Sequence, residues 1–215
     1  MLVIHYTGMP DARSALQRLS DATAKVSAHY LIDEDGVMYR MVAEDRRAWH
    51  AGVSAWRGRR DVNDRSIGVE LVNPGHEFGY SPFPPAQMAA LIRLATGILA
   101  RHPIPPRNVV GHSDIAPERK QDPGELFDWA GLARAGIGLW PPGNSLRSAG
   151  MAGSAAKARA MLAGIGYDIP ASGLPDCALG SVVAAFQRHF RPHRVDGLID
   201  GETLARMEGL LSRIT

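Results

Sequence analysis

The sequence predicts a mixed α/β domain, with a central sheet flanked by helices, followed by a small C-terminal bundle of three helices. Apolar strand-like runs alternate with helical patterns over about the first 140 residues. A stretch rich in Pro, Gly and Ser follows, and the remaining residues show helical periodicity only. We therefore expect a first domain at 1–140, a linker at 141–154 and a helical domain at 155–215.

The first half of the larger domain is predicted from short apolar runs separated by turn residues. A Pro-Asp pair opens a helix over 11–23, and Asp35 with Gly36 supplies the turn of a hairpin. The segment 49–64 is rich in Gly, Arg and Trp without clean periodicity, so we expect a long surface loop. The predicted strands of this half lie at 2–6, 28–32, 37–42 and 66–72.

The second half contains the most regular helix. Pro84 and Pro85 open it, one of its faces is apolar, and the His102-Pro103 pair ends it. A buried strand at 109–111 follows, and a short helix near 126–135 closes the domain. Beyond the linker, helices are predicted at 155–164, 179–190 and 202–214.

Composition excludes several functions. The 215 residues carry 24 Lys and Arg against 22 Asp and Glu, a net charge of +2, and no run of five or six like charges indicates nucleic-acid binding. Apolar stretches such as 94–100 are too short for a membrane span, which needs roughly 18 to 20 residues. The single Cys177 excludes an internal disulfide. Residues 1–6 resemble no export signal, so we expect a cytoplasmic protein, or a periplasmic one if a leader has been removed.

Two histidines and one aspartate have a pattern typical of catalytic zinc sites. His5 ends the first predicted strand, His112 follows another, and Asp122 lies ten residues later. Two imidazoles and a carboxylate leave a fourth coordination position for water. Because the chain has eight histidines, spacing alone leaves the choice of ligands open.

Five short sequence words, in this order, carry a resemblance to a known family. They are LVIHYT at 2–7, AWHAG at 48–52, SIGVEL at 66–71, GHSDIAP at 111–117 and RKQDPG at 119–124. Together they resemble the zinc-dependent N-acetylmuramoyl-L-alanine amidases of the AmpD/AmiD type over roughly residues 1–140. The resemblance implies one Zn²⁺ ion held by His5, His112 and Asp122, with no ligand missing.

The same resemblance implies two catalytic residues. Glu70 matches the family's strand glutamate and would act as the base that takes a proton from water. Lys120 matches the catalytic lysine and would place a cation near the developing oxyanion. The structural alternatives are an arginine-paired Glu70 and a solvated Lys120. His50 could either orient the substrate or support a metal-ligating side chain, whereas His29 is expected to be structural.

Four further side chains are candidates for the substrate groove. Trp56 lies among polar residues and could stack on a sugar ring, whereas Trp49 could be partly core. Arg65 could grip carboxylates of a stem peptide, and Asn73 could hydrogen-bond a peptide amide.

The C-terminal domain carries a second resemblance. AFQRHF at 185–190 and VDGLIDG at 195–201 are similar to the three-helix peptidoglycan-binding domain. It could bind wall glycan or brace the catalytic domain. The acidic turns at 33–36 and 196–201 lack the spacing of a twelve-residue calcium loop and are interpreted as turns.

The function implied is hydrolysis of the amide between N-acetylmuramic, or 1,6-anhydro-N-acetylmuramic, acid and L-Ala, in peptidoglycan recycling or turnover. A non-catalytic muropeptide receptor using the same groove is the alternative. A lysozyme would need a second carboxylate across the glycosidic bond, and Glu70 has no evident partner for that role. The preference between muropeptides and intact wall, the oligomeric state and any gating of the groove stay open.

Overall fold

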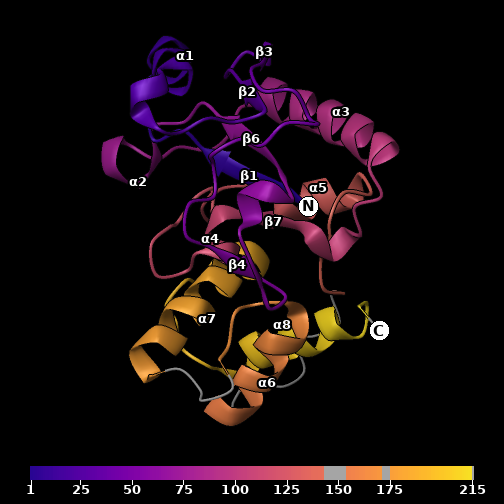
Figure 1. Cartoon of the computed structure of the whole chain (residues 1–215). Coiled ribbons are helices and arrows are strands. Elements are labelled where there is room, and N and C mark those ends of the chain that lie inside the picture. Colours follow the sequence, from indigo (N-terminus) through magenta and orange to yellow (C-terminus); the bar gives the residue numbers. More distant parts are fainter. Residues whose placement is uncertain (143–153, 171–174, 215) are drawn as a thin grey trace.

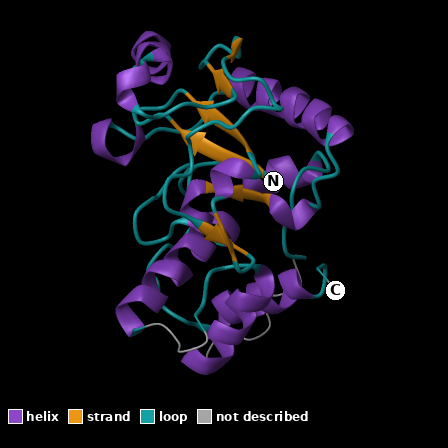
Figure 2. Ribbon diagram, viewed as in Figure 1, coloured by secondary structure: helices purple, strands orange, loops and turns teal. Residues whose placement is uncertain are grey.

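A five-stranded mixed sheet forms the centre of the larger part of the molecule (Figures 1 and 2). The computed structural model describes residues 1–142, 154–170 and 175–214. The strand order is β3-β2-β6-β1-β7, and only β3 runs antiparallel to its neighbour. The strands are β1 (Leu2–Tyr6), β2 (Tyr30–Ile32), β3 (Met38–Arg40), β6 (Ile67–Leu71) and β7 (Val109–Gly111). The predicted α/β class with a mixed sheet is confirmed.

The two faces of the sheet are covered by different elements. Because side chains alternate along a strand, Leu2 and Ile4 of β1 pack on one face and Val3 and His5 lie on the other. Helices α3 (Pro85–Arg101) and α5 (Trp129–Arg134) cover the first face. Helix α1 (Ala12–Ser20) covers the second face over β2. The rest of the second face is left for the functional site and for the C-terminal helices.

Short elements complete this part of the chain. Two single-turn helices flank the sheet, α2 (Gly75–Phe78) and α4 (His112–Ile115). Three 3₁₀ turns lie at Ala22–Ala24, Val62–Asp64 and Pro106–Asn108. In the part of the chain that the structure describes, no helix is both long and apolar enough to span a bilayer.

The segment 49–64 is not the long surface loop that its composition predicts. It forms a small hairpin of β4 (Ala55–Trp56) and β5 (Arg59–Arg60), whose turn residues Arg57 and Gly58 have φ of 54° and 67°. Trp56 and Val62 are buried. The prediction is wrong because Trp56 and Val62 pack into one apolar cluster with the C-terminal helices, which a local pattern does not reveal.

The predicted C-terminal helices are present as α6 (Ala155–Ile165), α7 (Asp176–Phe190) and α8 (Gly201–Leu211). They lie below the sheet in Figure 1, with α7 next to α4. Val3 and Val110 of the sheet share one apolar cluster with Leu162 and Phe186 of the helices. The bundle is therefore packed on the larger part by a continuous core. The predicted linker falls largely on 143–153, outside the described residues, and the predicted domain limits stay a prediction.

Candidate metal and catalytic site

The candidate site lies where three parallel strands end. His5 is in β1, and Glu70 of β6 is its partner in the strand register. His112 begins α4 directly after β7, and Asp122 comes from the following loop. The carboxyl ends of β1, β6 and β7 therefore bring His5 next to residues that lie 65 and 107 positions later in the sequence.

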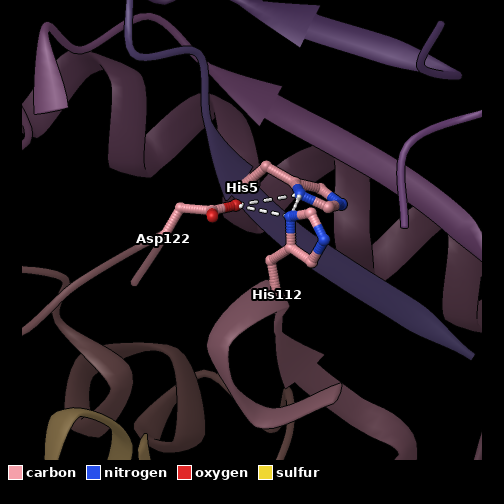
Figure 3. A group of neighbouring side chains, drawn as sticks. All are labelled: His5, His112 and Asp122. Carbon is pink, nitrogen blue, oxygen red and sulfur yellow. Dashed lines mark hydrogen bonds and ion pairs between the residues drawn. The ribbon is translucent and has the colours of Figure 1, made fainter. Parts of the chain in front are cut away.

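The three predicted metal ligands meet at one point (Figure 3). His5 Nδ1 lies 3.0 Å from His112 Nδ1, and Asp122 Oδ2 lies 3.0 and 3.1 Å from these two nitrogens. All three side chains are buried. Ligand atoms about 2.0–2.1 Å from a tetrahedral zinc ion stand roughly 3.3 Å apart, so the observed spacing suits a single ion.

A backbone carbonyl sets the tautomer of His112. The Ala51 carbonyl oxygen can only accept, so His112 Nε2 donates to it over 3.1 Å. In a neutral imidazole the other nitrogen then carries a lone pair. His112 Nδ1 thus presents a lone pair to Asp122 Oδ2 and His5 Nδ1.

A chain of three hydrogen bonds sets the tautomer of His5 in the same way. The Ser66 hydroxyl donates to the Val62 carbonyl over 2.6 Å, so its oxygen accepts from His50 Nε2 at 3.2 Å. His50 Nδ1 is then an acceptor for His5 Nε2, which donates to it over 2.9 Å. His5 Nδ1 is left with a lone pair that points into the cluster.

Electrostatics agree with this assignment. Burial, and next the nearby His112, lower the pKa of His5 to about 4. Burial alone would raise the pKa of Asp122, but His112 and His5 lower it well below its usual range. With the tautomers that these hydrogen bonds favour, two imidazole lone pairs and a carboxylate oxygen face one another. Such an arrangement is favourable only around a cation, so the residues present fit a bound metal ion.

A glycine makes the His50 contact possible. A Cβ at Gly68 of β6 would lie 2.4 Å from the His50 ring. The ring therefore packs directly on the strand backbone and reaches His5 from there. This close approach requires Gly at position 68. The predicted alternative that His50 supports a ligand agrees with these contacts.

Glu70 has the environment of a base. Its Oε2 is buried and has no hydrogen-bond partner among the described residues. Burial raises its pKa well above the usual range, Asp122 raises it further, and Lys120 lowers it. An ion pair with arginine, the structural alternative for Glu70, is not found in the described part of the chain. His29 is structural as expected, since it accepts from Gly68 N and donates to the Arg46 carbonyl.

The cluster opens into a pocket of about 570 Å³. His50, Glu70, His112 and Asp122 line it together with Lys120. Its further lining residues include two exposed arginines and three ring-bearing side chains, namely Arg18, Arg119, His76, Trp49 and Phe78. The pocket thus combines a polar floor with cations and stacking surfaces.

Three predicted substrate residues lie outside this pocket. Trp56 is only 2% exposed and packs edge-to-face on Tyr167 of the C-terminal part, with ring centroids 5.2 Å apart. Arg65 donates to the Trp56 carbonyl and lines a separate hollow. Asn73 is buried and holds a turn, donating to the Ser81 carbonyl and accepting from Gly75 N. The structure corrects these three assignments, because each side chain is already engaged elsewhere.

The groove candidate Trp49 lines the pocket, whereas Tyr6 and His76, which also line it, escaped sequence reasoning. Trp49, and not Trp56, is the exposed tryptophan, at 54%, and Arg47 lies 4.1 Å over its ring. Tyr6 and His76 are hydrogen-bonded at 2.9 Å on the pocket wall. Tyr6 directly follows His5 at the end of β1, but alternation along the strand points the two side chains to opposite faces, and no local signal indicates that Tyr6 and His76 would meet at the pocket.

A buried His-His-carboxylate cluster at the strand ends of a mixed sheet, with an unpartnered carboxyl group beside it, is the arrangement typical of metal-dependent hydrolases. Residues 1–125 match the N-acetylmuramoyl-L-alanine amidase family, and residues 154–207 match a putative peptidoglycan-binding domain. The chain therefore belongs to the N-acetylmuramoyl-L-alanine amidase family and is a peptidoglycan amidase of recycling or turnover.

Relatives support the assignment over the whole chain. The N-acetylmuramoyl-L-alanine amidase AmiD of Escherichia coli is 44% identical over 99% of this chain and 82% of its own length. A structure of AmiD with the substrate anhydro-N-acetylmuramic acid-L-Ala-D-gamma-Glu-L-Lys matches at a TM-score of 0.92 and 42% identity, covering 99% of this chain and 88% of that one. A structure of Pseudomonas aeruginosa AmpDh3 in complex with anhydromuramic pentapeptide matches at a TM-score of 0.91 and 38% sequence identity. The match covers 100% of this chain and 91% of that one.

Proposed function

We propose that this amidase acts with one Zn²⁺ ion held by His5 Nδ1, His112 Nδ1 and Asp122 Oδ2. The observation that carries the proposal is the convergence of three acceptor atoms within 3.1 Å of one another, with no donor between them. When bound, the ion supplies Lewis-acid activation of a water molecule and of the scissile carbonyl. Two nitrogens and one oxygen are the ligand types of catalytic zinc sites.

Glu70 is the proton acceptor in this proposal. The Glu70 side chain lines the pocket near Asp122, where an attacking water would lie, and its Oε2 has no hydrogen-bond partner among the described residues. The carboxylate takes a proton as the water oxygen bonds to the carbonyl carbon. It returns that proton to the amide nitrogen as the C–N bond breaks. Its raised pKa makes Glu70 a stronger base than a solvated carboxylate, and Lys120 helps to keep it ionised.

Lys120 stabilises negative charge on the carbonyl oxygen. It lines the pocket and is close enough to lower the pKa of both His5 and Glu70. A fixed cation at that place favours the transition state over the neutral amide.

The substrate proposed is a muropeptide that carries an anhydro-N-acetylmuramic acid and a stem peptide. Both relatives described above were solved with such ligands. In this chain, exposed Arg18 offers a partner for a stem-peptide carboxylate, and exposed Trp49 offers a face for a sugar ring. The cytoplasmic location expected from the sequence remains a prediction, which fractionation of cells can test.

Product analysis by mass spectrometry tests the proposal. Anhydro-muropeptide and intact sacculi are incubated with the enzyme, with and without a chelator. We expect free stem peptide from the anhydro-muropeptide, loss of release with chelator and recovery with added zinc. Glu70→Gln should retain zinc and lose about 10²- to 10⁴-fold in kcat.

Glu118→Gln is the matched control, because Glu118 is an exposed carboxylate outside the pocket lining. It should turn over substrate at the wild-type rate. Full activity of Glu70→Gln would overturn the assignment of the base. Tight muropeptide binding without release from either substrate would favour the receptor alternative.

A further inference from the structure

A buried aspartate joins the C-terminal helices to the helix that carries His112. Asp114 of α4 accepts hydrogen bonds from Tyr167 Oη at 2.6 Å and from His189 Nδ1 at 2.7 Å. Both donors belong to the C-terminal part, and all three side chains are buried. Asp114 Oδ2 also accepts from Gly111 N at 2.8 Å, which closes the first turn of α4. The carboxylate of this one-turn helix is therefore held from both parts of the molecule.

The position of α4 decides the position of two metal ligands. His112 is its first residue, and Ser113 N donates to the Asp122 carbonyl over 2.9 Å. A shift of α4 would therefore move both the His112 imidazole and the backbone of Asp122. A helix of four residues has too few internal hydrogen bonds to hold itself in place, so its side-chain anchors decide where it lies.

The donors on the C-terminal side are themselves held rigidly. The His189 ring is stacked between Trp129 and Phe190, with centroids 3.7 and 3.8 Å away. Tyr167 packs on Trp56, and burial beside Asp114 raises its pKa well above the usual range, so it remains a hydrogen-bond donor. The contact thus joins two ordered surfaces.

We infer that Tyr167 and His189 are positioning residues of the amidase site, which hold His112 and Asp122 at metal-binding distance through Asp114. The inference rests on the proposed zinc site and assigns the C-terminal helices a part in it. Their role is then more than attachment to the wall: the larger part needs them for full metal affinity. Neither residue touches the substrate pocket lining.

Paired variants of His189 separate hydrogen bonding from packing. His189→Phe keeps an aromatic ring between Trp129 and Phe190 and loses the donor, whereas His189→Asn keeps a donor near the Nδ1 position and loses the stacking. Tyr167→Phe removes one oxygen atom only. Phe186→Leu is the control, since Phe186 is buried in the same apolar cluster and makes no bond to Asp114.

The measurements are the zinc Kd of the metal-depleted full chain, by competition with a fluorescent zinc indicator, its Tm, and kcat and KM. We expect Tyr167→Phe and His189→Phe to raise the zinc Kd about tenfold. Loss of a residue that hydrogen-bonds to a metal ligand typically costs about 10- to 100-fold in metal affinity, and these two residues act one step further from the metal. Both should lower kcat at sub-saturating zinc with KM nearly unchanged. His189→Asn should stay near wild type in zinc affinity, and Phe186→Leu should lower Tm only.

Wild-type zinc affinity in both Tyr167→Phe and His189→Phe would overturn the inference and leave the proposed function intact. A wild-type chain that binds no zinc would overturn both. If His189→Phe does not fold, Tyr167→Phe decides, because its change of volume is minimal.

Discussion

Two polar clusters of this protein contain buried ionisable side chains, and they differ in what completes them. In the C-terminal helices, Arg191 is fully buried, and its two terminal nitrogens donate to Asp200 and Asp196 over 2.5 and 3.0 Å. Positive charge there comes from the chain itself. At the strand ends, His5, His112 and Asp122 present acceptors to one another, and the missing charge must come from outside.

This difference distinguishes a polar cluster that stabilises the fold from one that binds a ligand. A cluster in which each carboxylate meets a cationic side chain of the protein needs no added ion and serves stability. A cluster of facing acceptors costs free energy until a cation binds, and the fold must compensate for that cost elsewhere. The two clusters should therefore respond in opposite ways to substitution and to zinc.

Removing a ligand should have the largest effect. His112→Ala leaves one imidazole and one carboxylate as ligands. Zinc affinity should therefore fall by more than roughly 100-fold, the upper range for loss of a residue that only hydrogen-bonds to a ligand. Activity should vanish with it. Zinc content after dialysis and product release by mass spectrometry check this prediction. Zinc retained at one ion per chain in this variant would remove His112 from the site.

Arg191→Met should show the opposite pattern. It leaves Asp196 and Asp200 without their buried partner, so the free energy of unfolding should fall by about 3 kcal/mol, the lower end for such losses because both carboxylates are partly exposed. Urea unfolding measures it. Zinc Kd of the folded variant should change by less than threefold. A large loss of zinc affinity with unchanged stability would reverse the comparison.

Ser66→Ala tests the hydrogen-bond chain that sets the His5 tautomer. Without the hydroxyl, His50 Nε2 loses its acceptor, and its proton is no longer fixed on that nitrogen. We expect the zinc Kd to rise about tenfold. Ser66→Thr keeps a hydroxyl and is the control. Equal zinc affinity in Ser66→Ala and wild type would show that the chain does not set the tautomer.

The smallest expected effect is on how the free energy of unfolding depends on pH, through Asp200 beside Arg191. Burial alone would raise the pKa of Asp200, but donors from Thr203 and Arg191 lower it to about 2. A lowered pKa in the folded state stabilises the protein above the unfolded value near 3.8, and this stabilisation is lost as pH falls through about 2. Allowing for solvent screening, the loss is about 1 kcal/mol. Urea unfolding at pH 6, 4 and 2.5 should show it, and Asp200→Asn should flatten the profile.

The sequence predicts the sheet, the C-terminal helices and the grouping of His5, Glu70, His112 and Asp122, because each of those features is marked locally. Alternating apolar residues mark strands, and short words mark the residues that follow them. The structure adds that the matching strand ends are adjacent in one parallel sheet. For these four site residues, the local sequence pattern and the sheet topology lead to the same site.

The errors arise where a distant segment decides burial. Trp56 lies among polar neighbours in sequence, yet Tyr167, more than a hundred residues later, covers it. Trp49 remains exposed because no such segment reaches it. The anchors of the site, the Ala51 carbonyl and Asp114, lie within the words AWHAG and GHSDIAP, but the words do not show that Ala51 accepts from His112 or that Asp114 accepts from Tyr167.

Titration of zinc into the metal-depleted chain tests the central claim most directly. Bound zinc and muropeptide-cleaving activity are followed together, with His112→Ala alongside. We predict that bound zinc and activity both rise linearly until one equivalent of zinc has been added, whereas His112→Ala gains neither bound zinc nor activity. Full activity before zinc is added, or a rise in activity that does not follow bound zinc, would contradict it.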